Sequence, residues 1–111
     1  MAFVRKKNKH FKWPVVVREP SEENAGEYAE NTFVAIFARL TRTEYAKLGE
    51  NNDELESLKK ILKGWEQLEE EDGTPVKYST NNLKALLEDP FWTTAVLDTY
   101  GKALEASKIK N

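Results

Sequence analysis

The residues of this chain that could do chemistry are few, and their spacing forms no catalytic arrangement. His10 is the only histidine among the 111 residues, and it lies in a basic flank without an acidic neighbour. There is no cysteine, which excludes disulfide bonds, thiolate metal sites and cysteine nucleophiles. A serine nucleophile elbow, a glycine-rich phosphate loop and an HExxH zinc motif are also absent. We therefore expect a protein that is not an enzyme and that binds no cofactor.

The densest group of potential metal ligands is a run of carboxylates before Gly73: Glu69, Glu70, Glu71 and Asp72. If Gly73 held the sixth position of an EF-hand calcium loop, Leu68 would hold the first position and Ser79 the twelfth. Neither residue fits, because the first position needs a carboxylate and the twelfth a bidentate glutamate. We therefore predict no metal site and interpret the run as a solvated acidic turn.

Charge is segregated along the chain, although the net charge is only −2. Residues 1–18 contain no acid and six bases: Arg5, Lys6, Lys7, Lys9, Lys12 and Arg18. Residues 66–72 contain five acids and no base. Such blocks can be two solvated surfaces, or they can pair between neighbouring copies in head-to-tail self-association. In the second interpretation, the first five of these bases meet the carboxylates of residues 69–72.

A nucleic-acid-binding or regulatory role is the alternative hypothesis, because the segment RKKNKHFKW interleaves bases with aromatic residues. Such a segment can contact phosphates and stack on bases. Without the six positive charges of residues 1–18, however, the net charge of −2 becomes −8 for residues 19–111. A dedicated DNA-binding domain of this size is normally basic overall. We therefore expect a partner other than nucleic acid.

The elements that position these residues predict an α+β fold, with a small N-terminal antiparallel β-sheet packed on a C-terminal cluster of helices. Residues 12–18 are β-branched and form a strand, in which Pro14 suits a sheet edge. Residues 28–40 are apolar on both faces, so periodicity alone fits either a strand or a buried helix. We favour a strand that pairs with residues 12–18 in a hairpin.

Helix signals follow from Thr41 onward. Thr41 and Glu44 have the spacing of a capping box, and Gly49 suits a left-handed helix end. Asp53 caps a longer helix whose core stripe is Leu55, Leu58, Ile61, Leu62 and Trp65. Ser79 or Thr80 caps the next helix. Asp89 and Pro90 open the last helix, whose stripe is Phe91, Ala95, Val96, Tyr100, Ala103 and Leu104.

The chain is expected to form a single domain. Its parts are a basic arm (1–11), a β-hairpin (12–40), a helical cluster (41–107) with a turn at 66–79, and a frayed tail (108–111). Trp13, Phe91 and Trp92 are candidate partner-binding residues, because aromatic side chains are frequent interface anchors. Phe91 and Trp92 lie about 100° apart on a helix. We expect Trp92 to be the partly exposed residue of the two.

The sequence indicates the cellular location of the protein only through the signals that it lacks. The segment MAFVRKKNKH is basic but is not followed by the apolar core of a secretory signal. No apolar run approaches the roughly 20 residues that cross a bilayer. We expect a cytoplasmic protein without a membrane partner.

The order of several short motifs resembles the tail assembly chaperones of tailed phages. These motifs are GW at 64–65, EEDG at 70–73, Pro75, YSTNNLKALL at 78–87, Pro90 with Phe91, and Tyr100. The N-terminal half is similar as well, with a proline-containing strand, an aromatic-rich strand and a T-x-x-E helix start. The resemblance covers most of the chain and depends on order and spacing, not on one motif.

The resemblance implies a small protein of the host cytoplasm that acts while phage tails are built and is absent from the finished particle. In that family, the protein is thought to coat the tape measure protein, keep it soluble and recruit tail tube subunits. Some members assemble into spirals or rings, and some have a longer form made by translational frameshifting. We therefore expect a homo-oligomeric chaperone that binds both proteins by multivalent contact.

Overall fold

The computed structural model describes residues 2–3, 10–50 and 52–109, with side chains up to residue 105. Within these residues, a three-stranded antiparallel sheet in the order β1-β2-β3 accompanies four helices, which confirms the α+β fold. The elements are β1 (His10–Pro20), β2 (Tyr28–Ala38), α1 (Arg42–Leu48), α2 (Glu54–Ile61), β3 (Leu62–Glu66), α3 (Thr80–Leu87) and α4 (Pro90–Ile109).

The hairpin of β1 and β2 confirms the strand interpretation of the second segment. Val15 pairs with Phe33, and the register continues to the turn at Pro20 and Tyr28. Alternate side chains face opposite sides of a strand, so Val15 and Phe33 enter the core while Val16 lies on the exposed face. Apolar residues occupy both faces of β2, which is why its sequence also resembled a buried helix.

A third strand, β3, was not predicted. The sequence indicated one helix through Leu62 and Trp65, but α2 ends at Ile61 and the next five residues pair with β2. Ala35 lies opposite Trp65 in this pairing. Gly64 favours the strand, because it weakens a helix and leaves room for Ile36 of β2. The pairing also satisfies backbone groups along that side of β2. The predicted helical cluster therefore contains a strand.

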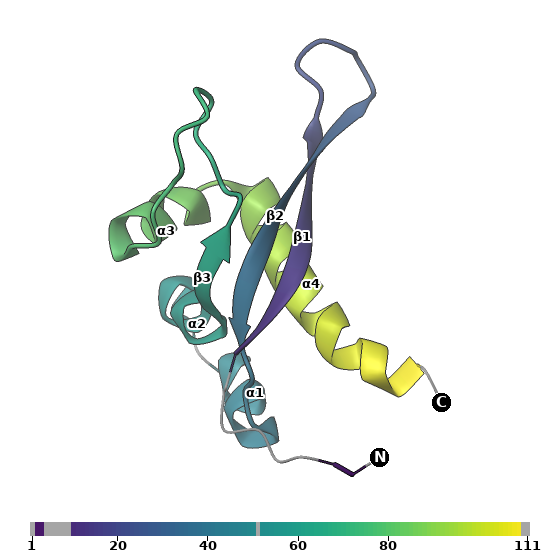
Figure 1. Cartoon of the computed structure of the whole chain (residues 1–111), viewed down its shortest axis with the longest axis vertical. Coiled ribbons are helices and arrows are strands. Elements are labelled where there is room, and N and C mark those ends of the chain that lie inside the picture. The colour runs from purple at the N-terminus through teal and green to yellow at the C-terminus, as the bar shows by residue number, and fades with distance from the viewer. Residues whose placement is uncertain (1, 4–9, 51, 110–111) are drawn as a thin grey trace.

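The core lies between the sheet and the helices, with α4 crossing behind β1 and β2 (Figure 1). Its largest fully buried side chains are Tyr100, Phe37, Leu58, Ile61, Leu62, Leu83, Val15 and Val96. The Tyr100 hydroxyl donates a hydrogen bond of 2.8 Å to the Ala38 carbonyl. Two segments far apart in sequence, the end of β2 and the middle of α4, are thereby joined.

The predicted helix starts are confirmed. Side-chain oxygens accept hydrogen bonds from first-turn backbone N–H groups at Thr41, Asp53, Ser79 and Asp89. Glu44 completes the capping box of α1. The prediction for Gly49 was wrong: its φ is −68°, so α1 ends in a right-handed turn in which Gly49 donates to the Lys47 carbonyl.

The predicted segment boundaries need two corrections. β1 begins at His10, so residues 10 and 11 belong to the sheet and not to a basic arm. α4 continues to Ile109, so residues 108 and 109 are helical where a frayed tail was predicted. Residues 110 and 111 lie outside the described residues. None of the helices in the described part of the chain combines the length and the apolar content needed to cross a bilayer.

Alkaline pH is expected to destabilise the protein through Tyr100. Burial raises the pKa of Tyr100 above its ordinary value of 10.0, so the folded state favours the protonated phenol. This contribution to stability is fully present below about pH 10 and is lost as the pH rises through the higher pKa of the folded state. Urea denaturation at pH 7 and pH 11 measures the loss. Tyr100→Phe should be about 1 kcal/mol less stable at pH 7 but should lose less stability at pH 11. An unchanged loss in the variant would contradict the assignment.

Candidate protein-interaction surfaces

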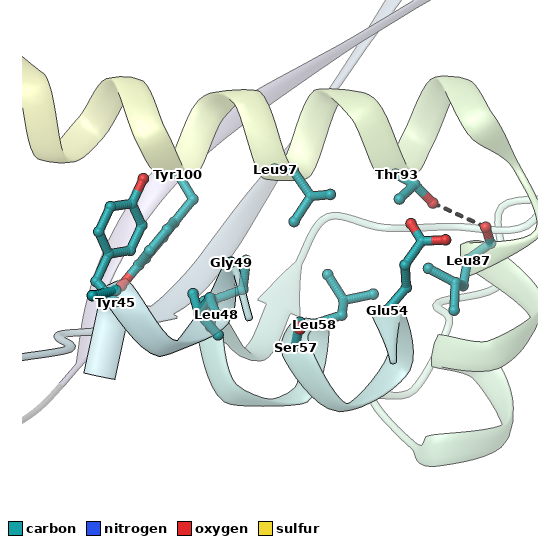
Figure 2. A pocket seen from close by; sticks show the side chains of 12 residues that line it. Tyr45, Leu48, Gly49, Glu54, Ser57, Leu58, Leu87, Thr93, Leu97 and Tyr100 are labelled. Atoms are coloured by element: carbon teal, nitrogen blue, oxygen red, sulfur yellow. Dashed lines mark hydrogen bonds between the residues drawn. The ribbon is translucent and has the colours of Figure 1, made fainter. Parts of the chain in front are cut away.

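A groove of about 500 Å³ lies between α1, α2 and α4, with the end of α3 closing one side (Figure 2). The apolar residues that line it are Tyr45 and Leu48 of α1, Leu58 and Ile61 of α2, Leu87 of α3, and Leu97 and Tyr100 of α4. Leu58 and Ile61 are fully buried and form its base, whereas Leu97 is 43% exposed. The groove therefore presents apolar surface that the described residues of the chain do not cover.

Polar groups lie at the margins of this groove. Glu54 and Thr93 face each other near one end, and the Tyr45 ring lies beside Tyr100 at the other (Figure 2). The Thr93 hydroxyl donates to the Leu87 carbonyl at 3.0 Å, so it already has a partner. A pocket for a small polar ligand needs several convergent polar groups, and this groove has few. Its chemistry suits an apolar side-chain stripe instead.

The groove exists because α1 does not enter the core. No residue of α1 is buried, and its aromatic contact with the core is that of Tyr45 with Tyr100, at 6.1 Å between ring centroids. Glu44, Ala46 and Lys47 are exposed, so this helix stands beside α4 without packing closely against it. Sequence reasoning missed the groove. The signal was Leu97, which follows Val96 and makes the apolar stripe of α4 too wide for one core face.

A second cavity, of about 780 Å³, lies at the end of the sheet near the β1–β2 turn. Its apolar surface includes Val17, Phe33, Leu86 and Trp92. Five carboxylates also line it, from Glu19, Glu69, Glu70, Glu71 and Asp89, and none of the described lysine and arginine residues does. The segment of residues 67–76 and the β1–β2 turn lie at the same end of the molecule (Figure 1). We refer to this feature as the acidic cavity.

Hydrogen bonds fix the acidic turn beside this cavity. The Trp65 Nε1–H donates to the Val76 carbonyl at 2.7 Å, and Val76 N–H donates to the Leu68 carbonyl at 2.9 Å. Gly73 adopts φ +88°, a backbone conformation that glycine tolerates without strain. The hydroxyl and the backbone N–H of Thr74 bond to Asp72 and lower the pKa of its carboxyl. The carboxylates of residues 69–72 therefore lie on a turn whose backbone is held by hydrogen bonds.

The predicted aromatic anchors have different environments. Trp92 is only 4% exposed, so the expectation that it is the exposed residue of the pair was wrong. It stacks on Phe33 at 6.0 Å between ring centroids and meets the edge of Trp65 at 6.3 Å. Phe91 is the outward residue, at 45% exposed. Trp13 is exposed on β1 next to Phe11 and remains a candidate contact.

The structure describes only some of the residues in the predicted pairing between the basic N-terminal segment and the acidic turn. Lys12 bonds to Glu66 at 2.8 Å and Arg18 to Glu30 at 3.1 Å, so both bases have partners within the chain. Arg5, Lys6, Lys7 and Lys9 lie outside the described residues. Glu69, Glu70, Glu71 and Asp72 are exposed, and they form none of the ion pairs seen among described residues.

No protein-family model, curated protein or solved structure matches this chain. Within residues 2–3, 10–50 and 52–109, no three histidine, cysteine, aspartate or glutamate side chains are grouped so that they could hold a metal ion. The two surfaces with a defined shape are the apolar groove and the acidic cavity.

Proposed function

We propose that this protein is an assembly chaperone that holds a long helical partner in the groove between α1, α2 and α4. The observation that carries the proposal is the open apolar groove, which is walled by helices and exposes Leu97 and Tyr45. An amphipathic helix binds such a groove by laying its apolar stripe into it. The resemblance to tail assembly chaperones supplies the candidate partner, the tape measure protein.

Binding by many copies suits this geometry. One groove can bury only a few apolar side chains, each contributing about 1.5–3 kcal/mol before the cost of ordering. Single contacts are therefore weak. A tape measure protein offers many apolar segments in sequence, and linked contacts raise the overall affinity strongly. The proposed chaperone coats the chain in the host cytoplasm, keeps it soluble, and leaves when tail tube subunits assemble around it.

The alternative, a nucleic-acid-binding role through residues 5–18, receives less support from the described residues. Lys12 and Arg18 are engaged with Glu66 and Glu30. Both pairs lie on the exposed sheet surface, where such pairs contribute about 1 kcal/mol or less. Salt-sensitive retention on DNA at physiological salt, beyond that of an acidic control protein, would favour the alternative.

Co-expression tests the proposed function. The gene that follows this coding sequence is expected to encode a very long, largely helical protein. Produced alone, that protein should be mostly insoluble. Produced with this chain, it should be recovered in the soluble fraction and co-purify with several copies of the chain. A partner that stays insoluble, or a soluble partner that carries no bound chain, would contradict the proposal.

A further inference from the structure

Glu54 is the one charged residue among the described residues that line the groove between α1, α2 and α4. It is the first residue of α2, and its carboxylate takes part in none of the hydrogen bonds or ion pairs formed within the described part of the chain. Glu56, in the same first turn of α2, pairs instead with Lys59 at 3.8 Å and does not line the groove. The groove therefore contains a carboxylate that has no cationic partner among the described residues.

This carboxylate lies at one end of the groove. Figure 2 shows Glu54 beside Thr93, with Tyr45 and Tyr100 at the other end. Thr93, Leu97 and Tyr100 have the spacing i, i+4 and i+7 on α4, so they lie along one face of that helix. The seven steps from residue 93 to residue 100 span about 10 Å at the rise of an α-helix. The apolar wall is therefore about two helical turns long, and Glu54 lies at its end.

A helix that fills the groove removes water from Glu54. A carboxylate that loses water beside an apolar side chain and gains no partner costs binding free energy, and a second carboxylate there adds repulsion. Lysine and arginine avoid this cost, because each pairs with the carboxylate while its aliphatic stem lies along the apolar surface. The groove therefore favours a helix whose apolar stripe has a positive charge at one end.

We propose that the groove recognises an amphipathic helix whose two-turn apolar stripe ends in lysine or arginine, and that Glu54 is the residue that selects this charge. One apolar side chain of the bound helix contacts the Tyr100 end, a second lies three or four residues away against Leu97, and the basic side chain lies seven residues from the first and pairs with Glu54. This inference rests on the proposed function, and it names the segments of the long helical partner that the chaperone holds.

Two synthetic peptides test the charge preference. Each has about 18 residues, enough to be helical in isolation, and each carries two leucines with the spacing described above. They differ only at the position seven residues from the first leucine, which is lysine in the basic peptide and glutamate in the acidic peptide. Fluorescence anisotropy measures their affinities for the unmodified chain. The basic peptide should bind about 10-fold more tightly, and the difference should shrink as salt rises. Equal affinities would overturn the inference.

Charge reversal at Glu54 assigns the preference to this residue. The Glu54→Lys variant should bind the acidic peptide more tightly than the basic one, because the two charges of the contact have been exchanged. Misfolding cannot produce this reversal, since tight binding of the acidic peptide needs an intact groove. Glu56→Lys is the matched control: it places the same charge in the same helical turn but outside the groove, and should still prefer the basic peptide. An unchanged preference in Glu54→Lys, or a reversal in Glu56→Lys, would overturn the role of Glu54.

The same peptides separate this inference from the proposed function. Leu97→Gln removes apolar surface from the groove without adding a charge, so it should weaken binding of both peptides about equally. If the two peptides bind the unmodified chain with equal affinity and Leu97→Gln weakens both, the charge preference fails and the groove proposal stands. If the basic peptide is preferred but the long partner stays insoluble in the co-expression experiment, the proposed function fails alone. If neither peptide binds, both fail.

Discussion

Replacing Leu97 with glutamate is expected to weaken binding of the helical partner about 100-fold while leaving the fold intact. Leu97 is 43% exposed and faces the groove, so the free protein tolerates a carboxylate there. In the complex, the variant loses about 1 kcal/mol from burial of the exposed part of Leu97 and must also desolvate a charge against the apolar stripe of the helix. A fluorescently labelled segment of the proposed helical partner, titrated with each form, measures the change.

Val16→Glu is the matched control for this experiment. Val16 is exposed to a similar degree, at 44%, but it lies on the surface of the sheet that faces away from the core. The Val16→Glu variant gains the same charge and should bind the helical partner with the affinity of the unmodified chain. Equal losses of affinity in both variants would indicate a general effect of the added charge. An unchanged affinity in Leu97→Glu would show that the partner does not bind in the groove.

Phe37→Ala is expected to destabilise the protein by about 3–5 kcal/mol, the largest effect of any single substitution considered. Phe37 is fully buried between Phe11 and Tyr100, with ring centroids at 5.7 and 5.0 Å. A domain of this kind is typically stable by only about 5–15 kcal/mol, so the variant should be close to unfolding. Urea denaturation followed by circular dichroism gives the change in the free energy of unfolding.

Phe91→Ala supplies the comparison, because the same side chain is removed from a position that is 45% exposed. Its cost should be clearly smaller, about 1–2 kcal/mol, since almost half of the side chain is already exposed to solvent. Similar costs for the two phenylalanines would contradict the assignment of Phe37 to the core and of Phe91 to the surface.

Local signals in the sequence predicted most of the helix starts and the hairpin. Thr41, Asp53, Ser79 and Asp89 act on backbone groups two or three residues away, so a short window of sequence contains all the required information. The strand at Leu62–Glu66 was missed for the opposite reason. Its partner, β2, lies far away in sequence, and pairing with a distant strand overrides local helical spacing.

The candidate site was predicted less well than the fold. The groove depends on how far α1 stands from α4, and the acidic cavity brings Glu19 beside residues 69–71; both are properties of tertiary packing. Trp92 is an example of a burial that the local sequence does not determine. Neighbouring positions on a helix cannot both face the core, but only the position of Phe33 decides that Trp92 and not Phe91 does so.

Photocrosslinking from the groove shows whether the helical partner binds there. The chain carries p-benzoylphenylalanine in place of Leu97, or in place of Val16 as control, and is produced together with the proposed helical partner. We predict covalent adducts with that long protein from position 97 and almost none from position 16. Adducts from position 16 alone, or a co-purifying partner that never crosslinks from position 97, would show that binding occurs elsewhere on the molecule.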